Sequence, residues 1–352
     1  MIAGEGERMK LRMLAFTGRG ARLCRALATA LAGTGYDCEA FAGGRAAREA
    51  GMPPLPGSLQ DFAGQAFREC GGLIFVGACG IAVRAIAPHL RDKFTDPAVL
   101  VIDDRGRYVI PLLSGHVGGA NELAKTVAGA LGATPVITTA TDVNDLFSVD
   151  AWAKREDLHL AGRQAAKEVS ARLLDCKEVF LYSDFAIDGP LPGGVVLSDK
   201  GECGICLSLD ENKNPFSCTL NLVPRLVTAG IGCRKGTSGR QIEEQVCAAL
   251  AQSGISPHAL CAAASIDCKR EEPGLLDFCE RYRLPLRTFT AAQLQKAPGE
   301  YTPSRFVEET VGVDNVCERA AVLAGGRLIV RKRARDGVTV ALAVREWRAC
   351  FE

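Results

Sequence analysis

The chain has 352 residues, of which 47% are hydrophobic and 24% charged, and its formal net charge at pH 7 is +1. This composition predicts a folded, soluble protein of two or three domains. The near-zero charge argues against a surface built for bulk binding of nucleic acid or acidic membranes, and no apolar run approaches the length that spans a bilayer.

The cysteines and the start of the chain bear on the expected compartment. The opening MIAGEGERMK lacks the apolar core of a signal peptide, so the fifteen cysteines predict a cytoplasmic protein with reduced thiols. Most of them lie in apolar runs, where cysteine behaves as a small hydrophobe. Cys203 and Cys206 form a C-x-x-C pair, but no second pair at zinc-site spacing accompanies it, which makes a metal or redox role the less favoured interpretation.

Helical and strand patterns alternate along the chain, which predicts an α/β fold of two sandwich domains with mainly parallel sheets. We expect the N-terminal domain to span residues 1–145. In it the turn DRG is predicted to join two strands as a hairpin, and Ser58 to cap a helix that runs through Cys70. Its predicted strands are residues 11–17, 36–41, 72–77, 99–103, 108–113 and 135–139. Its other predicted helices are residues 21–32, 81–90 and the segment after SGHVGG.

Residues 146–222 predict a smaller, irregular middle segment, with helices at 147–157 and 163–174 and short strands between turns. Residues 223–352 predict the C-terminal α/β domain. It opens on a strand at 222–231, and Ser238 and Gln241 form a capping box for its first helix. Its further predicted elements are strands at 262–266 and 286–289, helices at 241–252, 274–283, 304–311 and 316–323, and two final strands joined across Asp336-Gly337.

The segment TAGIGCRKGTSGRQ carries a glycine-rich turn between a strand and a helix of this domain. Glycines let the backbone approach a ligand, and a helix N-terminus favours an anion. The glycine spacing matches neither the Walker loop nor the dinucleotide fingerprint, so a carboxylate or phosphate ligand is expected rather than a nucleotide. An ordinary strand-to-helix turn is the alternative. The predicted substrate-binding residues here are Gly230, Gly232, Cys233, Arg234, Lys235, Gly236 and Thr237.

A second candidate site is the segment SGHVGGANE, which follows a predicted strand at the sheet edge where open α/β folds bind ligands. His116 lies between its glycines, and an imidazole suits acid–base chemistry near neutral pH. A structural role in capping the next helix is the alternative. His89 and His258 follow prolines at helix boundaries, and His159 is expected at a charged helix end. The predicted substrate-binding residues of this loop are Ser114, Gly115, Gly118 and Gly119.

Carboxylates form a third candidate group, at Asp103, Asp104 and in the stretch TTATDVND at 138–145. Asp, Asn and Thr after a buried strand suit the binding of polar substrate groups or of a water. Turn and helix-cap chemistry is the alternative, because the same residue types favour it. The chain contains no serine in a nucleophile elbow and no H-E-x-x-H motif, so any hydrolysis is expected to use activated water.

Several long motifs occur in a distinctive order. The N-terminal ones are GLIFVGACGIAVRAIAPHL, VLVIDDRGRYVIPLLSGHVGGANELA and TPVITTATDVNDLFSVDAWA. The C-terminal ones are VTAGIGCRKGTS, ASIDCKREEPGLLDFCERYRLPLRTFTAAQL and TPSRFVEETVGVDNVCERAA. Over nearly the whole chain these motifs resemble the cobalt-precorrin-5A hydrolase family of anaerobic cobalamin biosynthesis. The C-terminal part also resembles a small standalone protein of the aerobic pathway. Cys203 and Cys206 are not residues that the family is expected to require.

The resemblance implies a hydrolase that opens the δ-lactone of cobalt-precorrin-5A with water, giving cobalt-precorrin-5B and acetaldehyde. For this reaction we assign His116 as the acid–base group, Asn121 or Thr139 as the group that orients water or stabilises the oxyanion, and Glu308 as a weaker candidate. The expected partner is the cobalt-precorrin, with transient contacts to neighbouring pathway methyltransferases and none to nucleic acid or membrane. No cofactor and no protein-bound metal are expected, because the substrate carries the cobalt.

Two other functions compete with this hypothesis. A carrier or scaffold for corrinoid intermediates would bind the lactone but release no acetaldehyde. A nucleotide-dependent enzyme would use residues 230–236, and a nucleotide titration would reveal it.

Overall fold

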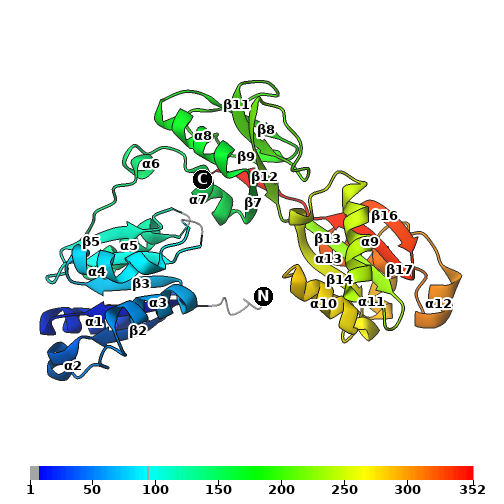
Figure 1. Ribbon diagram of the computed structural model, residues 1–352. Helices are drawn as coiled ribbons and strands as arrows, with labels where there is room; N and C mark the ends of the chain where they lie inside the picture. Colours follow the sequence, from blue (N-terminus) through cyan, green and yellow to red (C-terminus); the bar gives the residue numbers. More distant parts are fainter. Residues whose placement is uncertain (1–7, 93–94, 117, 352) are drawn as a thin grey trace. The chain divides into compact units, whose positions relative to one another are not determined.

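The computed structural model describes residues 8–92, 95–116 and 118–351, and the chain divides into two compact units, Met1–Ala151 and Trp152–Glu352 (Figure 1). Each unit contains helices packed on sheets with mainly parallel strands, which confirms the α/β class. Among the described residues, no helix combines the length and apolar character needed to cross a membrane.

A six-stranded sheet with the order β2-β1-β3-β4-β5-β6 forms the first unit. Strands β2, β1, β3 and β4 run parallel, whereas β5 pairs antiparallel with β4 and so confirms the predicted hairpin. The strands are β1 (Met9–Ala15), β2 (Tyr36–Ala42), β3 (Gly72–Val76), β4 (Ala98–Ile102), β5 (Tyr108–Leu113) and β6 (Thr134–Pro135). The predicted strand at 135–139 is wrong beyond Pro135, because Pro111 of β5 and Pro135 itself lack the N–H groups that a longer ladder needs.

Helices cover both faces of this sheet. Side chains alternate along β3, so Ile74 and Val76 pack under α1, α2 and α5, while Leu73 and Phe75 pack under α3 and α4. Ser58 accepts a hydrogen bond from the Asp61 amide and caps α3 as predicted. The covering helices are α1 (Gly18–Leu31), α2 (Gly44–Ala50), α3 (Leu59–Glu69), α4 (Cys79–Ile86) and α5 (Ala120–Leu131), with a 3-10 turn η1 at Ala87–His89. Helix α6 (Ala140–Val143) follows in the chain, and α7 (Val149–Arg155) spans the boundary between the two units.

The middle of the chain is more regular than expected. A five-stranded sheet with the order β10-β8-β11-β12-β7 lies there, parallel except for β7, and α8 (Arg163–Leu174) spans the predicted helix. A two-stranded pair, β9 with β18, joins the end of the chain to this region. The strands are β7 (Leu158–Ala161), β8 (Val179–Ser183), β9 (Ala186–Asp188), β10 (Val195–Leu197), β11 (Cys203–Leu207), β12 (Cys218–Pro224) and β18 (Arg348–Cys350).

The C-terminal sheet has the order β15-β14-β13-β17-β16. The predicted strand at 222–231 is instead two strands in different sheets, because β12 ends at Pro224 and β13 begins at Val227. The capping box and the hairpin across Asp336-Gly337 are confirmed. The strands are β13 (Val227–Cys233), β14 (Leu260–Ile266), β15 (Leu286–Phe289), β16 (Arg327–Arg335) and β17 (Val338–Val344).

Helices also cover both faces of the C-terminal sheet. Helices α9 and α10 pack on one face around Ile231 and Phe278, and α11, α12 and α13 pack on the other around Ala264 and Leu294. The helices are α9 (Gly239–Ala251), α10 (Pro273–Arg281), α11 (Ala291–Gln295), α12 (Arg305–Val311) and α13 (Cys317–Gly325), with 3-10 turns η2 (Pro257–Ala259) and η3 (Asp267–Lys269).

Candidate active site

The loop between β5 and α5 folds back on itself. Ser114 has a left-handed φ of 60°, and its hydroxyl donates to the Asp96 carbonyl at 3.0 Å. The Ala120 amide donates to the Ser114 carbonyl at 3.0 Å and closes the turn. A Cβ at Gly118 would lie 2.1 Å from that of Ser114, so the closed turn leaves no room for a side chain there. Gly119, with a φ of 82°, is the N-cap residue of α5.

This loop brings the His116 imidazole to a carboxylate. The Nε2 atom lies 2.5 Å from Asp142 Oδ2 and 2.8 Å from the Thr141 hydroxyl, both of which come from α6. The His116 side chain is 21% exposed and that of Asp142 is 24% exposed, so the pair remains accessible while its contacts are partly shielded from water. Because an ionised carboxylate only accepts hydrogen bonds, Asp142 fixes the proton on Nε2 and leaves Nδ1 as the basic nitrogen.

Asn121 holds this pair from the first turn of α5. Its side chain is 3% exposed, and its amide nitrogen donates to Asp142 Oδ2 and to the Thr139 hydroxyl, each at 3.0 Å. A Cβ at Gly115 would lie 2.9 Å from the Asn121 side-chain oxygen, so the network also requires a small residue at that position. The group forms a connected polar cluster within the first unit.

A cavity of about 440 Å³ adjoins the cluster. This volume lies within the range of small-molecule sites. Lys125 is a cation at its wall, and the hydrogen bond from Lys125 to Glu122 raises the pKa of the lysine. The wall thus combines a positive charge with Asp142, the carboxylate partner of His116. The lining residues are Lys125, Pro135, Ile137, Thr141, Asp142, Val143, Asp145 and Leu146.

The structure brings together five residues that the sequence singled out, namely Ser114, Gly115, His116, Asn121 and Thr139. Glu308 is not part of this group, because it belongs to the second unit, where it lies exposed on α12. Sequence reasoning did not single out Thr141 or Asp142 as individual groups. The available signal was their position in the polar stretch at 138–145, directly after a segment that leaves the sheet.

Asp103 and Asp104 of the third candidate group accept hydrogen bonds within the first unit. Asp103 accepts hydrogen bonds from the amides of Arg105, Arg107 and Tyr108 at 2.6 to 3.1 Å. Burial raises the pKa of Asp103, but these amide hydrogen bonds outweigh it and the net pKa is lowered. Asp104 accepts from the Thr17 hydroxyl, which also caps α1. Asp103 therefore has the turn role that the sequence left as an alternative, whereas Asp104 contacts a residue distant in sequence.

Gly230 and Gly232 lie within β13 and pack against neighbouring elements. A Cβ at Gly230 would lie 1.9 Å from the Cys317 carbonyl, and one at Gly232 would lie 2.6 Å from the Thr339 hydroxyl. These positions are glycine because α13 and β17 approach the strand closely. Packing thus accounts for these two glycines, and their expected role in ligand approach stays a prediction.

Side chains of the same domain already satisfy several backbone N–H groups at the tip of the second loop. The Gly236 amide donates to Glu272 at 2.7 Å, and Lys269 pairs with the same carboxylate at 2.8 Å. Ser238 and Gln241 satisfy further N–H groups at the start of α9 through the capping box. The expected open helix N-terminus is thus wrong for these groups. Thr237 is buried and its hydroxyl donates to the Arg234 carbonyl.

Three side chains of this loop have other surroundings. Arg234 and Lys235 are exposed, so their charges remain available to an anion. Cys233 is half-buried, and burial raises the pKa of its thiol, which disfavours a thiolate there.

Cys203 and Cys206 are both buried within β11. Because side chains alternate along a strand, residues three apart project to opposite faces and do not form a ligand pair. Burial, followed by the neighbouring Cys218, raises the pKa of Cys203 to about 12, and burial raises that of Cys206 to about 12. The pair is therefore part of the core, in line with the favoured interpretation of the sequence.

An accessible imidazole–carboxylate pair beside a cavity, on an α/β scaffold, defines the class of protein as one equipped for acid–base chemistry on a small molecule. The chain matches the family descriptions "Cobalamin synthesis G N-terminal" over residues 61–142 and "Cobalamin synthesis G C-terminus" over residues 227–343. It belongs to this cobalamin synthesis G family, whose members include proteins named cobalt-precorrin-5A hydrolase. The N-terminal match contains the whole His116 cluster.

Three relatives illustrate the extent of the similarity. The cobalt-precorrin-5A hydrolase of Salmonella typhimurium is 40% identical over 310 residues, covering 84% of this chain and 88% of that protein. The cobalt-precorrin-5A hydrolase of Priestia megaterium is 32% identical over 317 residues, covering 84% of each chain. Protein CobE from Sinorhizobium sp is 34% identical over 118 residues, covering 32% of this chain and 77% of that protein.

Proposed function

We propose that this chain is a cobalt-precorrin-5A hydrolase, which opens the δ-lactone of its substrate with water and yields cobalt-precorrin-5B and acetaldehyde. The observation that carries the proposal is the 2.5 Å contact between His116 and Asp142 in the region that matches the family. The names of the two long relatives support the substrate class. We place the reaction in the cytoplasm. It requires no cofactor, because the cobalt belongs to the substrate.

The acid–base step uses the two nitrogens of His116 separately. Nε2–H donates to Asp142, and Nδ1 takes a proton from water as the water oxygen bonds to the lactone carbonyl carbon. The ester C–O bond then breaks, and the imidazolium returns the proton to the departing alkoxide. Asp142 stabilises the imidazolium between these events. The freed carbinol then loses its O–H proton and its carbon–carbon bond to the macrocycle breaks. The electron pair of that bond stays with the macrocycle, and the carbinol carbon leaves with its methyl group as acetaldehyde.

Asn121 acts as a positioning residue in this scheme. Both of its described donor contacts go to Asp142 and Thr139, so its amide holds the network and neither orients the water nor stabilises the oxyanion. Thr139 accepts from Asn121 and keeps its own O–H to orient the water. Lys125 supplies positive charge at the cavity for a peripheral carboxylate of the substrate.

Arg234 and Lys235 have a binding role in this proposal. The substrate bears several acetate and propionate groups, and two exposed cations beside a turn suit such carboxylates. Gly236 and Thr237 shape the turn that presents them, through a left-handed φ of 78° and a hydrogen bond to the Arg234 carbonyl. Transient contacts with the pathway methyltransferases that produce and consume these intermediates belong to the same proposal.

The decisive experiment is acetaldehyde release from cobalt-precorrin-5A by the full-length protein under anaerobic conditions. The proposal predicts catalytic release, with one acetaldehyde for each cobalt-precorrin-5B formed. Saturable binding of the substrate without release above the protein-free rate would contradict the hydrolase and favour a carrier.

A further inference from the structure

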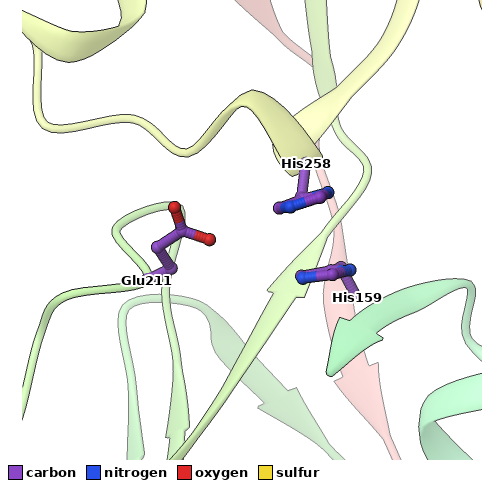
Figure 2. A group of neighbouring side chains, drawn as sticks. All are labelled: His159, Glu211 and His258. Atoms are coloured by element: carbon purple, nitrogen blue, oxygen red, sulfur yellow. The ribbon is translucent and has the colours of Figure 1, made fainter. Parts of the chain in front are cut away.

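Three side chains of metal-ligand type meet in the second unit, apart from the residues of the candidate active site (Figure 2). His159 comes from β7, Glu211 from the loop after β11, and His258 from η2. One ligand atom of each lies within 4.8 Å of those of the other two. No sequence pattern groups these residues, and the predicted helix end at His159 is wrong because the residue lies in a strand.

Backbone pairing fixes where these residues lie. His159 is paired with Val223 in the antiparallel ladder of β7 and β12. The Ser256 amide donates to the Leu209 carbonyl at 2.8 Å, which ties the start of η2 to the loop that carries Glu211. The Ser256 hydroxyl accepts from the His258 amide at 3.2 Å. Three segments distant in sequence are thus held together by main-chain contacts, and their side chains converge on one point.

The ligand atoms of this group make no hydrogen bond or ion pair to the described residues of the chain. In the part of the chain that the structure describes, no hydrogen bond or ion pair engages the ring nitrogens of His159 or His258, or the Glu211 carboxylate. The two rings stack, with centroids 3.5 Å apart and an interplanar angle of 9°. His159 and Glu211 are half-buried, while His258 is exposed. Two imidazoles and a carboxylate whose ligand atoms are unused form a donor set that suits a cation.

The donor chemistry indicates the class of cation. Two imidazole nitrogens and one carboxylate oxygen suit borderline divalent ions such as zinc and cobalt(II), whereas magnesium and calcium favour oxygen ligands. Around a tetrahedral ion with bonds of about 2.0 to 2.2 Å, ligand atoms are roughly 3.4 Å apart. The stacked rings must therefore turn so that their lone pairs converge. The exposed His258 side chain and the loop position of Glu211 allow this movement.

We propose that His159, Glu211 and His258 form a binding site for a borderline divalent cation, with water in the remaining coordination position. The bound ion links β7, the loop after β11 and η2, and thereby fastens the middle sheet to the C-terminal sheet within the second unit. This cation is held by the protein and is separate from the cobalt of the proposed substrate. The site shares no residue with the His116 cluster, so its existence does not depend on the proposed reaction.

The small number of histidines makes the site directly observable. The chain has four, at positions 89, 116, 159 and 258. We would label the full chain with ¹⁵N-histidine and titrate it with zinc chloride while recording ring resonances by NMR. At one equivalent of zinc, the ring signals of His159 and His258 should shift, and those of His89 and His116 should remain. The variants H159Q and H258Q assign the two signals.

Affinity measurements complete the test. Removal of a ligand in E211Q or H258Q should weaken zinc binding about 100-fold, since even loss of a supporting group costs 10- to 100-fold. These two residues are exposed or lie in a loop, so the fold should survive, and circular dichroism checks it. The fifteen cysteines are the competing ligands. The variant C176S/C268S removes the two exposed thiols and should bind with unchanged affinity, and cobalt(II) should give no thiolate charge-transfer band.

Three outcomes would overturn the proposal. They are absence of ring shifts at His159 and His258 with excess zinc, unchanged affinity in both E211Q and H258Q, and loss of binding in C176S/C268S.

Discussion

Two glycine-rich segments, residues 114–119 and 230–237, lead from a strand to a helix, and the second begins within β13. In the first, glycines make room for side chains that contact one another, as Gly115 does for Asn121 and Thr139. In the second, Gly230 and Gly232 make room for neighbouring elements, and the Gly236 amide donates a hydrogen bond to Glu272. Glycine content therefore does not separate a reactive loop from a packed one. What separates them is the partner of each N–H group and the space beside each Cα.

Of the substitutions in the two loops, His116→Ala should have the largest effect on activity. Loss of a general acid–base group costs about 10³-fold in kcat. The measurement is acetaldehyde release from cobalt-precorrin-5A at saturating substrate. The matched control is His89→Ala, because His89 contacts the Gln60 carbonyl outside the cluster and should keep wild-type turnover. A loss of less than tenfold in His116→Ala would remove this residue from the chemical step.

The packing role of the second loop predicts a stability effect at Gly230. In Gly230→Ala the new methyl group would lie 1.9 Å from the Cys317 carbonyl, so we expect a loss of about 3 kcal/mol in the free energy of unfolding. Gly236→Ala is the control, because its Cβ would meet no atom within 4 Å. Only the left-handed φ of 78° disfavours alanine there, and it should lower the free energy of unfolding by about 1 kcal/mol. Denaturant titration measures both. Equal stability of the two variants would contradict the packing account.

Asp142→Asn tests how the first loop orients its histidine. The amide cannot stabilise the imidazolium and can favour the wrong tautomer, so we expect kcat to fall about 100-fold with little change in KM. Because Asp142 acts through His116, the acidic limb of the pH–rate profile should also move. A change confined to KM would show that Asp142 contacts the substrate and does not position His116.

The exposed cations of the second loop should affect binding alone. In the double variant R234A/K235A, loss of two charges should raise KM about tenfold while kcat stays unchanged, since the interaction is equal in ground and transition states. Arg240→Ala is a matched control, because this nearby side chain is exposed and pairs with Glu244. A fall in kcat in R234A/K235A would mean that this loop contributes to the chemical step.

The smallest effect concerns the carboxylate inside the second loop. The hydrogen bond from Lys269, and then that from the Gly236 amide, lower the pKa of Glu272 below its ordinary value of 4.5. A lowered pKa in the folded state means stability that is present above pH 4.5 and lost as pH falls through the folded value. Glu272→Gln should therefore cost about 1 kcal/mol at pH 7 and progressively less below pH 4.5. A pH-independent difference in the free energy of unfolding would contradict this account.

Local patterns in the sequence predicted local structure well. The cap at Ser58, the capping box at Ser238 and the final hairpin depend on residues a few positions apart, and each is confirmed. Pairings between distant segments carried no such signal, as in β9 with β18 or His159 with His258. The candidate site lies between these cases. Its histidine is marked by neighbouring glycines, whereas Asp142 becomes a partner only once β5, α5 and α6 are assembled.

We propose that the first loop carries out the acid–base step and that the second loop binds carboxylates of the substrate. The most direct test is single-turnover opening of the lactone at saturating protein, comparing His116→Ala with R234A/K235A. We predict that the chemical step slows about 10³-fold in His116→Ala and keeps its wild-type rate in R234A/K235A. A reversal of these effects, or equal slowing in both variants, would contradict the division of roles between the two loops.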